Sequence, residues 1–318
     1  MHRLVCLFVA LVLAACGSRA VATSPTVTPT PTVESRSTPT ASPTGGGSGS
    51  QDTVLGPAGM TLQQEVGAVM MVGFKGPLTP AVLEDWRQHQ FGGLIVLPIN
   101  QNAGDAAAIR QLIQSVRGVM LHPLMAATNS ELATTSSGLK ALGFDINLAP
   151  VADGLDRRLG TQDVAAAVAS IHAAGMYAVA DHFPGNGNPD FGPFKAAIAA
   201  HVEFILVGHL NVPSIDASAP TSMSAAALRI LRSELGYQGV IISDDLQMGA
   251  LLPQYPPPSA AVRFLKSGGD MVIVSDDIAV ADATYAAIHA AVLNGSYPRA
   301  RLDASVQKLL SLGLRFMP

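Results

Sequence analysis

The sequence predicts an α/β protein, a single (β/α)8 TIM barrel preceded by a disordered lipoprotein tether. From residue 53 onward, eight short apolar runs with the composition of buried strands alternate with helical patterns. Short stretches rich in Gly, Pro, Asn and Asp separate these segments. Eight strand–helix units in this length match a closed barrel. An open doubly wound sheet is the alternative, but it usually has fewer strands.

The expected strands and helices can be given by their residue ranges. The strands are expected at residues 68–74, 93–97, 119–127, 145–150, 177–181, 204–208, 239–243 and 271–275. The helices are expected at residues 80–89, 103–116, 163–174, 194–200, 225–235, 259–267, 279–293 and 302–312.

Polar side chains follow most of the expected strands. They are Asn100, Asn129, Glu131, Asp153, Asp181, His182, His209, Asp244, Asp276 and Asp277. In a parallel barrel the carboxyl ends of all strands meet at one rim, where ligands bind. A single such residue means little because loops are polar in general, but their convergence predicts a site at this rim.

The seventh strand carries the strongest local signal. Its β-branched run Val240-Ile-Ile242 is suited to burial on both faces, and Asp244 and Asp245 follow it at once. Two carboxylates cannot lie inside such a run, so we expect both where the strand opens into a loop. The alternative is that one of them caps the next helix, because Asp is a preferred N-cap residue.

Composition limits the classes of partner. Hydrophobic residues make up 48% of the 318 residues, which is enough for a large core. Charged residues are only 13% and the net charge is −4, so the chain has no basic footprint for nucleic acid.

The first 52 residues predict export and anchoring. Residues 1–15 have the charge and apolar pattern of a signal peptide, and Leu13-Ala-Ala-Cys16 resembles the bacterial lipobox, which implies a lipid on Cys16 and attachment to a membrane. The alternative is an ordinary signal peptide that contains a cysteine. Residues 16–52 form a Ser/Thr/Pro/Gly linker with little to bury, and residues 53–318 form the barrel.

Three motifs in chain order identify a family. They are Leu148-Ala-Pro-Val-Ala-Asp153, His182-Phe-Pro-Gly-Asn-Gly-Asn188 and Ser243-Asp-Asp-Leu-Gln-Met-Gly249. With flanking segments from Met60 to Asp303, they resemble glycoside hydrolase family 3, in particular its bacterial β-N-acetylhexosaminidase branch. The resemblance covers nearly all of the expected barrel.

The resemblance implies a chemistry. Enzymes of this family hydrolyse β-linked N-acetylglucosamine, often from cell-wall fragments, with retention and with no metal or organic cofactor. The family's nucleophile is the Asp directly after Ser in the strand-seven motif, which falls on Asp244. Such a carboxylate attacks the anomeric carbon while a second group protonates the leaving oxygen. The implied partners are a carbohydrate and, through the lipid, a membrane.

The general acid of the family has no counterpart in this chain. In the β-N-acetylhexosaminidase branch an Asp-Ser-His loop follows the His-Phe-Pro-Gly motif, whereas here Gly192 and Phe194 stand at the Asp and His positions. Asp190 is close but out of register. Removing a general acid costs about 10² to 10⁴ in rate, which predicts weak or lost turnover. Asp190, Glu131 and His209 remain as substitutes, although for His209 a role within the fold is the simpler interpretation.

Other substrate contacts of the family are partly replaced. His182 is the secure match, Glu131 matches one residue of the segment that begins at Asn129, and the substrate-binding Arg maps onto Arg157, with Arg158 as the alternative. Asp181 replaces a Lys, and Asn186 replaces a second His. For Asp181 we favour a carboxylate that accepts hydrogen bonds from His182 or Arg157 over a catalytic group.

Three hypotheses about function follow. The first is a lipid-anchored family 3 glycosidase with Asp244 as nucleophile. The second is a pseudoenzyme that keeps the barrel as an extracytoplasmic module for binding glycans or a protein. The third, a metal-dependent hydrolase using His182, Asp181, His209 and Asp244, has suitable ligand types but no ligand-spacing signature.

Overall fold

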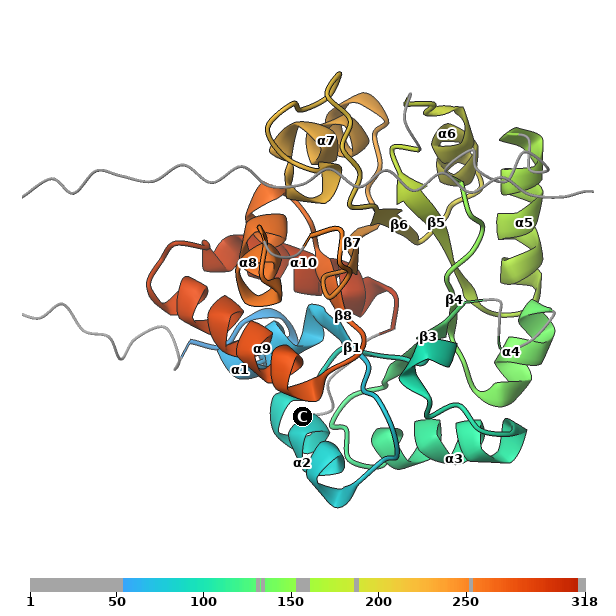
Figure 1. Ribbon diagram of the computed structural model, residues 1–318, viewed down its shortest axis with the longest axis vertical. Helices are drawn as coiled ribbons and strands as arrows, with labels where there is room; N and C mark the ends of the chain where they lie inside the picture. The colour runs from blue at the N-terminus through green and yellow to red at the C-terminus, as the bar shows by residue number, and fades with distance from the viewer. Residues whose placement is uncertain are drawn as a thin grey trace, which may run out of the picture. The chain divides into compact units, whose positions relative to one another are not determined.

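The chain folds into a closed ring of parallel strands, described here from a computed structural model (Figure 1). The structure describes residues 54–129, 132, 135–152, 161–185, 189–251 and 254–313. The signal peptide, Cys16 and the linker predicted before residue 53 lie outside these residues.

The strands are arranged in sequence order around the ring, and β8 pairs with β1 to close it. Their bounds are β1 Met70–Val72, β2 Gly93–Ile95, β3 Met125–Thr128, β4 Ile146–Asn147, β5 Tyr177–Phe183, β6 Phe204–Val207, β7 Val240–Asp245 and β8 Met271–Val274. This closure confirms the predicted (β/α)8 barrel and excludes the open doubly wound sheet.

Helices follow each strand and lie outside the ring in Figure 1. Their bounds are α1 Leu62–Ala68, α2 Pro80–His89, α3 Ala106–Arg117, α4 Ser136–Leu142, α5 Thr161–Ala173, α6 Gly192–Ala199, α7 Ala225–Arg229, α8 Pro257–Ser267, α9 Ile278–Leu293 and α10 Arg299–Ser311. The 3-10 turns are η1 Pro57–Gly59, η2 Pro98–Asn100 and η3 Thr221–Met223, and a π-helical turn, η4 Ile230–Glu234, continues α7.

The strands are apolar because both of their faces are covered. Every residue of β6 and β8 is buried, one side against the barrel interior and the other against the helices. Continuous Ile, Leu, Val and Met runs satisfy both faces at once, which is why the sequence predicted these strands reliably.

Two helices were not predicted, and both are short. In α1, Thr61 and Gln64 form a capping box, with Thr61 Oγ1 accepting from the Gln64 N–H at 3.3 Å. In α4, Thr135 caps the start and Gly143, at φ 103°, ends the helix in the left-handed region. These two helices are bounded by local caps, and each is too short for its apolar periodicity to predict a helix from the sequence.

Three carboxylates repeat one arrangement where the strands begin. Asp145, Glu203 and Asp270 directly precede β4, β6 and β8, and each accepts a hydrogen bond from a backbone N–H of the preceding strand. The distances are 3.1 Å from Ala126, 3.0 Å from Ala178 and 2.9 Å from Ile241. Each carboxylate also contacts a basic side chain, so the same groups join neighbouring strands and anchor the surrounding helices.

Within the described residues, no helix is both long and apolar enough to cross a membrane.

Candidate active site at the carboxyl end of the barrel

Two β-bulges shape the carboxyl end of the barrel. Along β5 three residue steps separate Ala180 from Phe183, while their partners on β6 are two steps apart. The same mismatch separates Ile242 and Asp245 on β7 from their partners on β8. A bulge inserts one extra residue and re-aims the side chains around it.

The bulges lie at the two residues with the most secure family match. His182 occupies the β5 bulge with φ 66°, a left-handed conformation that is uncommon for residues other than Gly. Asp244 occupies the β7 bulge. The expectation that Asp244 and Asp245 lie where the strand opens into a loop is therefore wrong, because β7 runs to Asp245. The backbone ladder resumes beyond His182 and beyond Asp244 because each bulge absorbs the extra residue.

A cavity of about 360 Å³ opens at this end of the barrel. It is lined by Ile95, Leu97, Asn129, Leu148, Ala149, Val151, Asp181, His182, Leu206, Asp244, Asp245 and Ile273. The structure thus brings His182 and Asp244 to one cavity, together with Asn129 and Asp181. A concave, largely apolar site with a few convergent polar groups is typical of a small-molecule site.

The three residues of the Ser-Asp-Asp motif have separate tasks. Ser243 is buried, and its Oγ accepts from the Ile273 N–H at 3.0 Å, replacing a ladder bond that the bulge displaces. Asp244 Oδ1 accepts from the Asp245 N–H at 2.8 Å. Among the described residues, Asp244 Oδ2 has no hydrogen-bond donor. Asp244 therefore lines the cavity with one carboxylate oxygen that is not engaged by a described donor.

Asp245 holds the end of β7 against β8. Its Oδ1 accepts from the N–H groups of Ser275 (3.1 Å) and Gln247 (3.2 Å), and its Oδ2 accepts from Ser275 Oγ (2.7 Å). Burial raises the pKa of Asp245, and these hydrogen bonds oppose the rise. Neither Asp caps the next helix, because α8 begins only at Pro257 with Pro256 as its N-cap.

His209 is buried, and both of its ring nitrogens are hydrogen-bonded. Nε2 lies 2.9 Å from the carbonyl oxygen of Asp245, and Nδ1 lies 2.7 Å from Ser222 Oγ. Burial lowers the pKa of His209, while the charge of Asp244 opposes that shift. His209 does not line the cavity, so the structure does not support its use as a substitute acid. Its two hydrogen bonds support a role within the fold.

Asp181 is buried beside His182 in the β5 bulge. Its backbone N–H donates to the Pro150 carbonyl at 3.0 Å, and its own carbonyl accepts from the Ala152 N–H at 3.2 Å. These bonds extend the pairing of the fourth and fifth strands beyond β4. The carboxylate thus faces the cavity from a rigid segment of backbone.

Several other rim residues predicted from the sequence have structural partners instead. Asn100 is buried and donates to the Ser275 carbonyl, while its Oδ1 accepts from the Leu97 N–H at 2.7 Å. Asp277 caps α9 by accepting from the Ala279 N–H at 2.9 Å. Neither residue, nor Asp276, lines the cavity. Rim position alone therefore overestimates the number of site residues.

The segment that replaces the family's acid loop is apolar and packed. Phe191 stacks on Phe183 with ring centroids 5.6 Å apart, and the fully buried Phe194 meets the same ring edge-on at 5.0 Å. Asp190 is exposed, and its Oδ1 accepts from the Gly192 N–H at 2.9 Å at the start of α6. Asp190 does not line the cavity, which removes it as a candidate acid in this conformation.

The remaining predicted site residues lie outside the described residues. They are Glu131, Asp153, Arg157, Arg158 and Asn186, and their contacts with substrate stay predictions. In the part of the chain that the structure describes, no group of three or more His, Cys, Asp or Glu side chains is arranged to hold a metal ion. His209, one ligand of the metal hypothesis, already uses both ring nitrogens within the fold.

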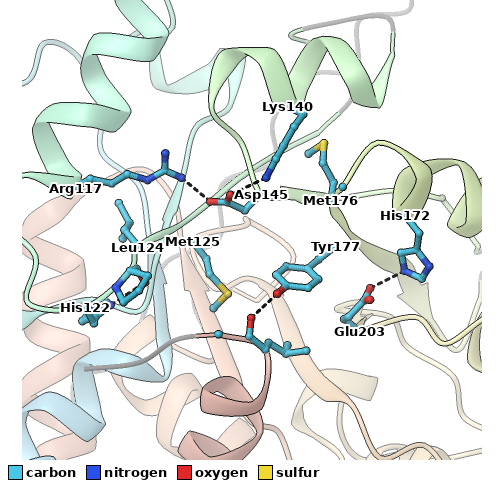
Figure 2. A pocket seen from close by; sticks show the side chains of 14 residues that line it. Arg117, His122, Leu124, Met125, Lys140, Asp145, His172, Met176, Tyr177 and Glu203 are labelled. Carbon is cyan, nitrogen blue, oxygen red and sulfur yellow. Dashed lines mark hydrogen bonds and ion pairs between the residues drawn. The ribbon is translucent and has the colours of Figure 1, made fainter. Parts of the chain in front are cut away.

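A larger cavity, of about 740 Å³, lies at the opposite end of the barrel, where β3 to β6 begin (Figure 2). Arg117 and Lys140 reach Asp145 at 2.6 and 3.2 Å, and His172 Nε2 lies 3.0 Å from Glu203 Oε2. These three interactions use the charged groups to stabilise the barrel itself. Size therefore does not identify the candidate site, because the smaller cavity is lined by Asp244, whose Oδ2 has no donor among the described residues.

Comparison with known proteins supports the same family. Residues 188–312 match the glycosyl hydrolase family 3 N terminal domain, a region that includes Asp244 but begins after His182. A β-hexosaminidase of Stenotrophomonas maltophilia is 31% identical over 186 residues, covering 48% of this chain and 55% of that protein. The β-hexosaminidase LpqI of Mycobacterium tuberculosis is 28% identical over 218 residues, covering 55% of each. The chain thus spans about half the length of these curated relatives.

Solved structures share the fold over most of the chain. A glycoside hydrolase family 3 β-N-acetylglucosaminidase from Paenibacillus has a TM-score of 0.70 and 26% identity, covering 80% of this chain and 62% of that one. M. tuberculosis LpqI has a TM-score of 0.69 and 22% identity, covering 82% and 96%. The barrel of this chain is therefore similar in sequence and fold to glycoside hydrolase family 3 proteins, with residues 188–312 matching the N-terminal domain of that family and the similar proteins including bacterial β-hexosaminidases.

Proposed function

We propose that this chain is a glycosidase-type barrel that acts on β-linked N-acetylhexosaminides, with Asp244 as the nucleophile of a retaining reaction and with weak turnover. The observation that carries the proposal is the position of Asp244: a bulge aims it into the cavity shared with His182, and Oδ2 has no donor among the described residues. The names of the related hexosaminidases support the choice of substrate class.

The proposed reaction has two steps. Asp244 Oδ2 attacks the anomeric carbon, and the glycosidic bond breaks with its electron pair going to the leaving oxygen, which departs as an alkoxide or aryloxide and takes a proton from solvent. Water then attacks that carbon, gives up a proton to solvent, and releases Asp244 as a carboxylate. The hydrogen bond from the Asp245 N–H to Oδ1 orients the carboxylate for this attack.

Leaving-group protonation is the weak point of this chain. Phe194 is buried where the family carries its acidic His, and the carboxylate of Asp245 is occupied by Ser275 and Gln247. We therefore expect useful rates only with leaving groups that need little protonation, and much slower rates with natural glycosides.

The test is release of an aryl alcohol from an activated aryl β-N-acetylglucosaminide. Wild type should release it, and Asp244→Asn should lose at least about 10³-fold in kcat because a neutral amide is a poor nucleophile. The matched control is Asp190→Asn, an exposed change outside the cavity that should retain wild-type rate. No release by wild type would reject hydrolysis of this substrate, and equal release by Asp244→Asn would reject the nucleophile.

A pseudoenzyme is the second candidate function. The apolar packing of Phe191 and Phe194 on Phe183 favours it, because buried aromatic rings stand in the segment where the family carries its acid. This candidate predicts binding of N-acetylglucosamine oligomers by wild type, measured by calorimetry, without any turnover of the activated substrate. The glycosidase predicts both.

We further propose that the barrel is held outside the cytoplasm by a lipid on Cys16. The lipobox-like Leu13-Ala-Ala-Cys16 supports this, and the Ser/Thr/Pro/Gly-rich residues 16–52 would supply the reach between membrane and substrate.

A further inference from the structure

His209 lies behind Asp244 in a chain of hydrogen bonds that no substrate contact explains. It follows β6, the strand between the two bulged strands, and only 8% of its surface is exposed. Its ring spans from η3 on one side to the backbone of Asp245 on the other.

The η3 side of this chain is firmly held. The Thr221 N–H donates to the Leu210 carbonyl at 2.8 Å, and Thr221 Oγ1 donates to the Gly208 carbonyl at 2.7 Å. Thr221 thus fixes η3 against the residues on both sides of His209. The adjacent Ser222, fully buried, places its hydroxyl 2.7 Å from Nδ1.

The acceptor at the other end sets the tautomer of the ring. A carbonyl oxygen can only accept, so Nε2 must carry the proton that it shares with Asp245 at 2.9 Å. In the neutral ring, Nδ1 then accepts from the Ser222 hydroxyl. Burial lowers the pKa of His209, which keeps this neutral form near pH 7.

Residue 245 is consequently held at three points. Its carboxylate is bound by Ser275 and Gln247, its carbonyl accepts from His209, and its N–H donates to Asp244 Oδ1. Because the carboxylate and the carbonyl of Asp245 are fixed, its N–H points in one direction. The Asp244 carboxylate that accepts from this N–H therefore has one orientation. The Asp245 carbonyl also accepts from the Met248 N–H at 3.0 Å, and the Leu246 N–H donates to the Ile273 carbonyl at 3.0 Å. Loss of the His209 bond would therefore remove one of three restraints on the 245–246 peptide and loosen the orientation of Asp244.

We propose that His209, oriented by Ser222, is a positioning residue for Asp244: its Nε2–H fixes the Asp245 carbonyl and thereby aims Oδ2 of Asp244 at the cavity. The inference rests on the proposed function, since it assigns His209 to the attack step and not to proton transfer. Such support is valuable because a misplacement of about 1 Å costs about 10²-fold in rate.

The experiment compares His209→Met, His209→Gln and Ser222→Ala with wild type on the activated aryl N-acetylglucosaminide. Met fills the space without a donor, whereas the Gln amide restores an N–H near the position of Nε2. We expect His209→Met to lower kcat by about 10²-fold, with KM changed less than about 3-fold. His209→Gln should recover most of that loss, and Ser222→Ala should lose about 10-fold, because the ring keeps its donor but not its orientation.

Two further readouts separate positioning from other roles. The rate at which a 5-fluoro glycosyl fluoride labels Asp244, followed by mass spectrometry, should fall in parallel with kcat in His209→Met. The acid and basic limbs of the kcat/KM profile should keep their pH values in His209→Gln, because a positioning residue does not titrate in the reaction. A lost limb in that variant would overturn the inference in favour of proton transfer.

The outcomes also separate this inference from the proposed function. Wild type that neither turns over nor labels would remove both. Active wild type with His209→Met at the same kcat would overturn the positioning role alone, as would equal losses in the Met and Gln variants, which indicate a packing role. If His209→Met does not fold, as judged by circular dichroism, Ser222→Ala with unchanged kcat would overturn it.

Discussion

At the scale of single residues, adjacent and chemically identical groups differ because their partners differ. Asp244 and Asp245 are neighbours, yet Asp245 has three donors to its carboxylate and Asp244 has one. The sequence could predict that both stand at the end of a strand. It could not predict which of the two carboxylates accepts hydrogen bonds from the end of β8, since that depends on Ser275, a residue thirty positions away.

Glu65 illustrates how burial controls a carboxyl group elsewhere in the fold. It is fully buried in α1 with Arg299 of α10 3.0 Å from its Oε1, while Oε2 has no hydrogen-bond partner among the described residues. Burial raises the pKa of Glu65 from 4.5 to about 7, despite the opposing effect of Arg299. The folded protein therefore holds a proton on Glu65 that the unfolded chain releases at lower pH.

This shift predicts how stability depends on pH. A raised pKa means that Glu65 contributes most below pH 4.5, and that its contribution falls as pH rises from 4.5 through 7. Glu65→Gln removes this dependence. The difference in free energy of unfolding between wild type and Glu65→Gln should change by about 3 kcal/mol across that window, measured by urea unfolding. A constant difference would contradict a protonated Glu65.

At the scale of elements, the strands form the hydrogen-bond ladder of the barrel and also contain the two bulges that interrupt it. Apolar runs predicted where the eight strands lie, because burial on both faces requires them. The bulges in β5 and β7 were not predicted. A bulge depends on the register against a neighbouring strand, which is a relation between distant segments and leaves no mark in the local pattern.

The strand-start carboxylates give a prediction at this scale. Asp270 is almost fully buried between Arg232 and Lys308, whereas Asp145 is partly exposed beside Arg117 and Lys140. Asn in place of Asp keeps an acceptor for the strand N–H but leaves the cations uncompensated. Asp270→Asn should therefore cost about 3 kcal/mol of unfolding free energy and Asp145→Asn under about 1 kcal/mol.

The measurement for this pair is urea unfolding of both variants in one buffer. Repetition at high salt should reduce the small Asp145→Asn effect further, because exposed pairs are screened and buried ones are not. Equal costs for the two variants would show that burial does not distinguish these carboxylates.

At the scale of the whole molecule, ring closure creates the site. His182 on β5 and Asp244 on β7 are 62 positions apart in the chain, yet the intervening β6 brings their strand ends together. The same closure creates the larger cavity at the other end, where paired charges stabilise the fold (Figure 2). The carboxylates that stand where the strands begin thus stabilise the fold, whereas the candidate nucleophile Asp244 stands at the carboxyl end.

The proposed lipid anchor is testable on the whole protein. The full chain, expressed in a bacterial host, should fractionate with membranes and incorporate labelled palmitate, whereas Cys16→Ser should do neither, because no sulfur remains for acylation. Cys6→Ser is the matched control, since Cys6 lies in the segment expected to be removed. Membrane association that survives Cys16→Ser would contradict the lipobox assignment.

By itself the sequence determined the barrel, the identity of its strands and the family resemblance. Those features depend on local composition and on motifs contiguous in the chain. The tertiary structure decided that Asp245 is bound by β8 while Asp244 Oδ2 has no donor among the described residues. It also decided that His209 bonds to the backbone and does not line the cavity, and that Phe191 and Phe194 pack on Phe183. These outcomes depend on hydrogen bonds and ring contacts between residues brought together by folding, and such contacts exist only once the ring has closed.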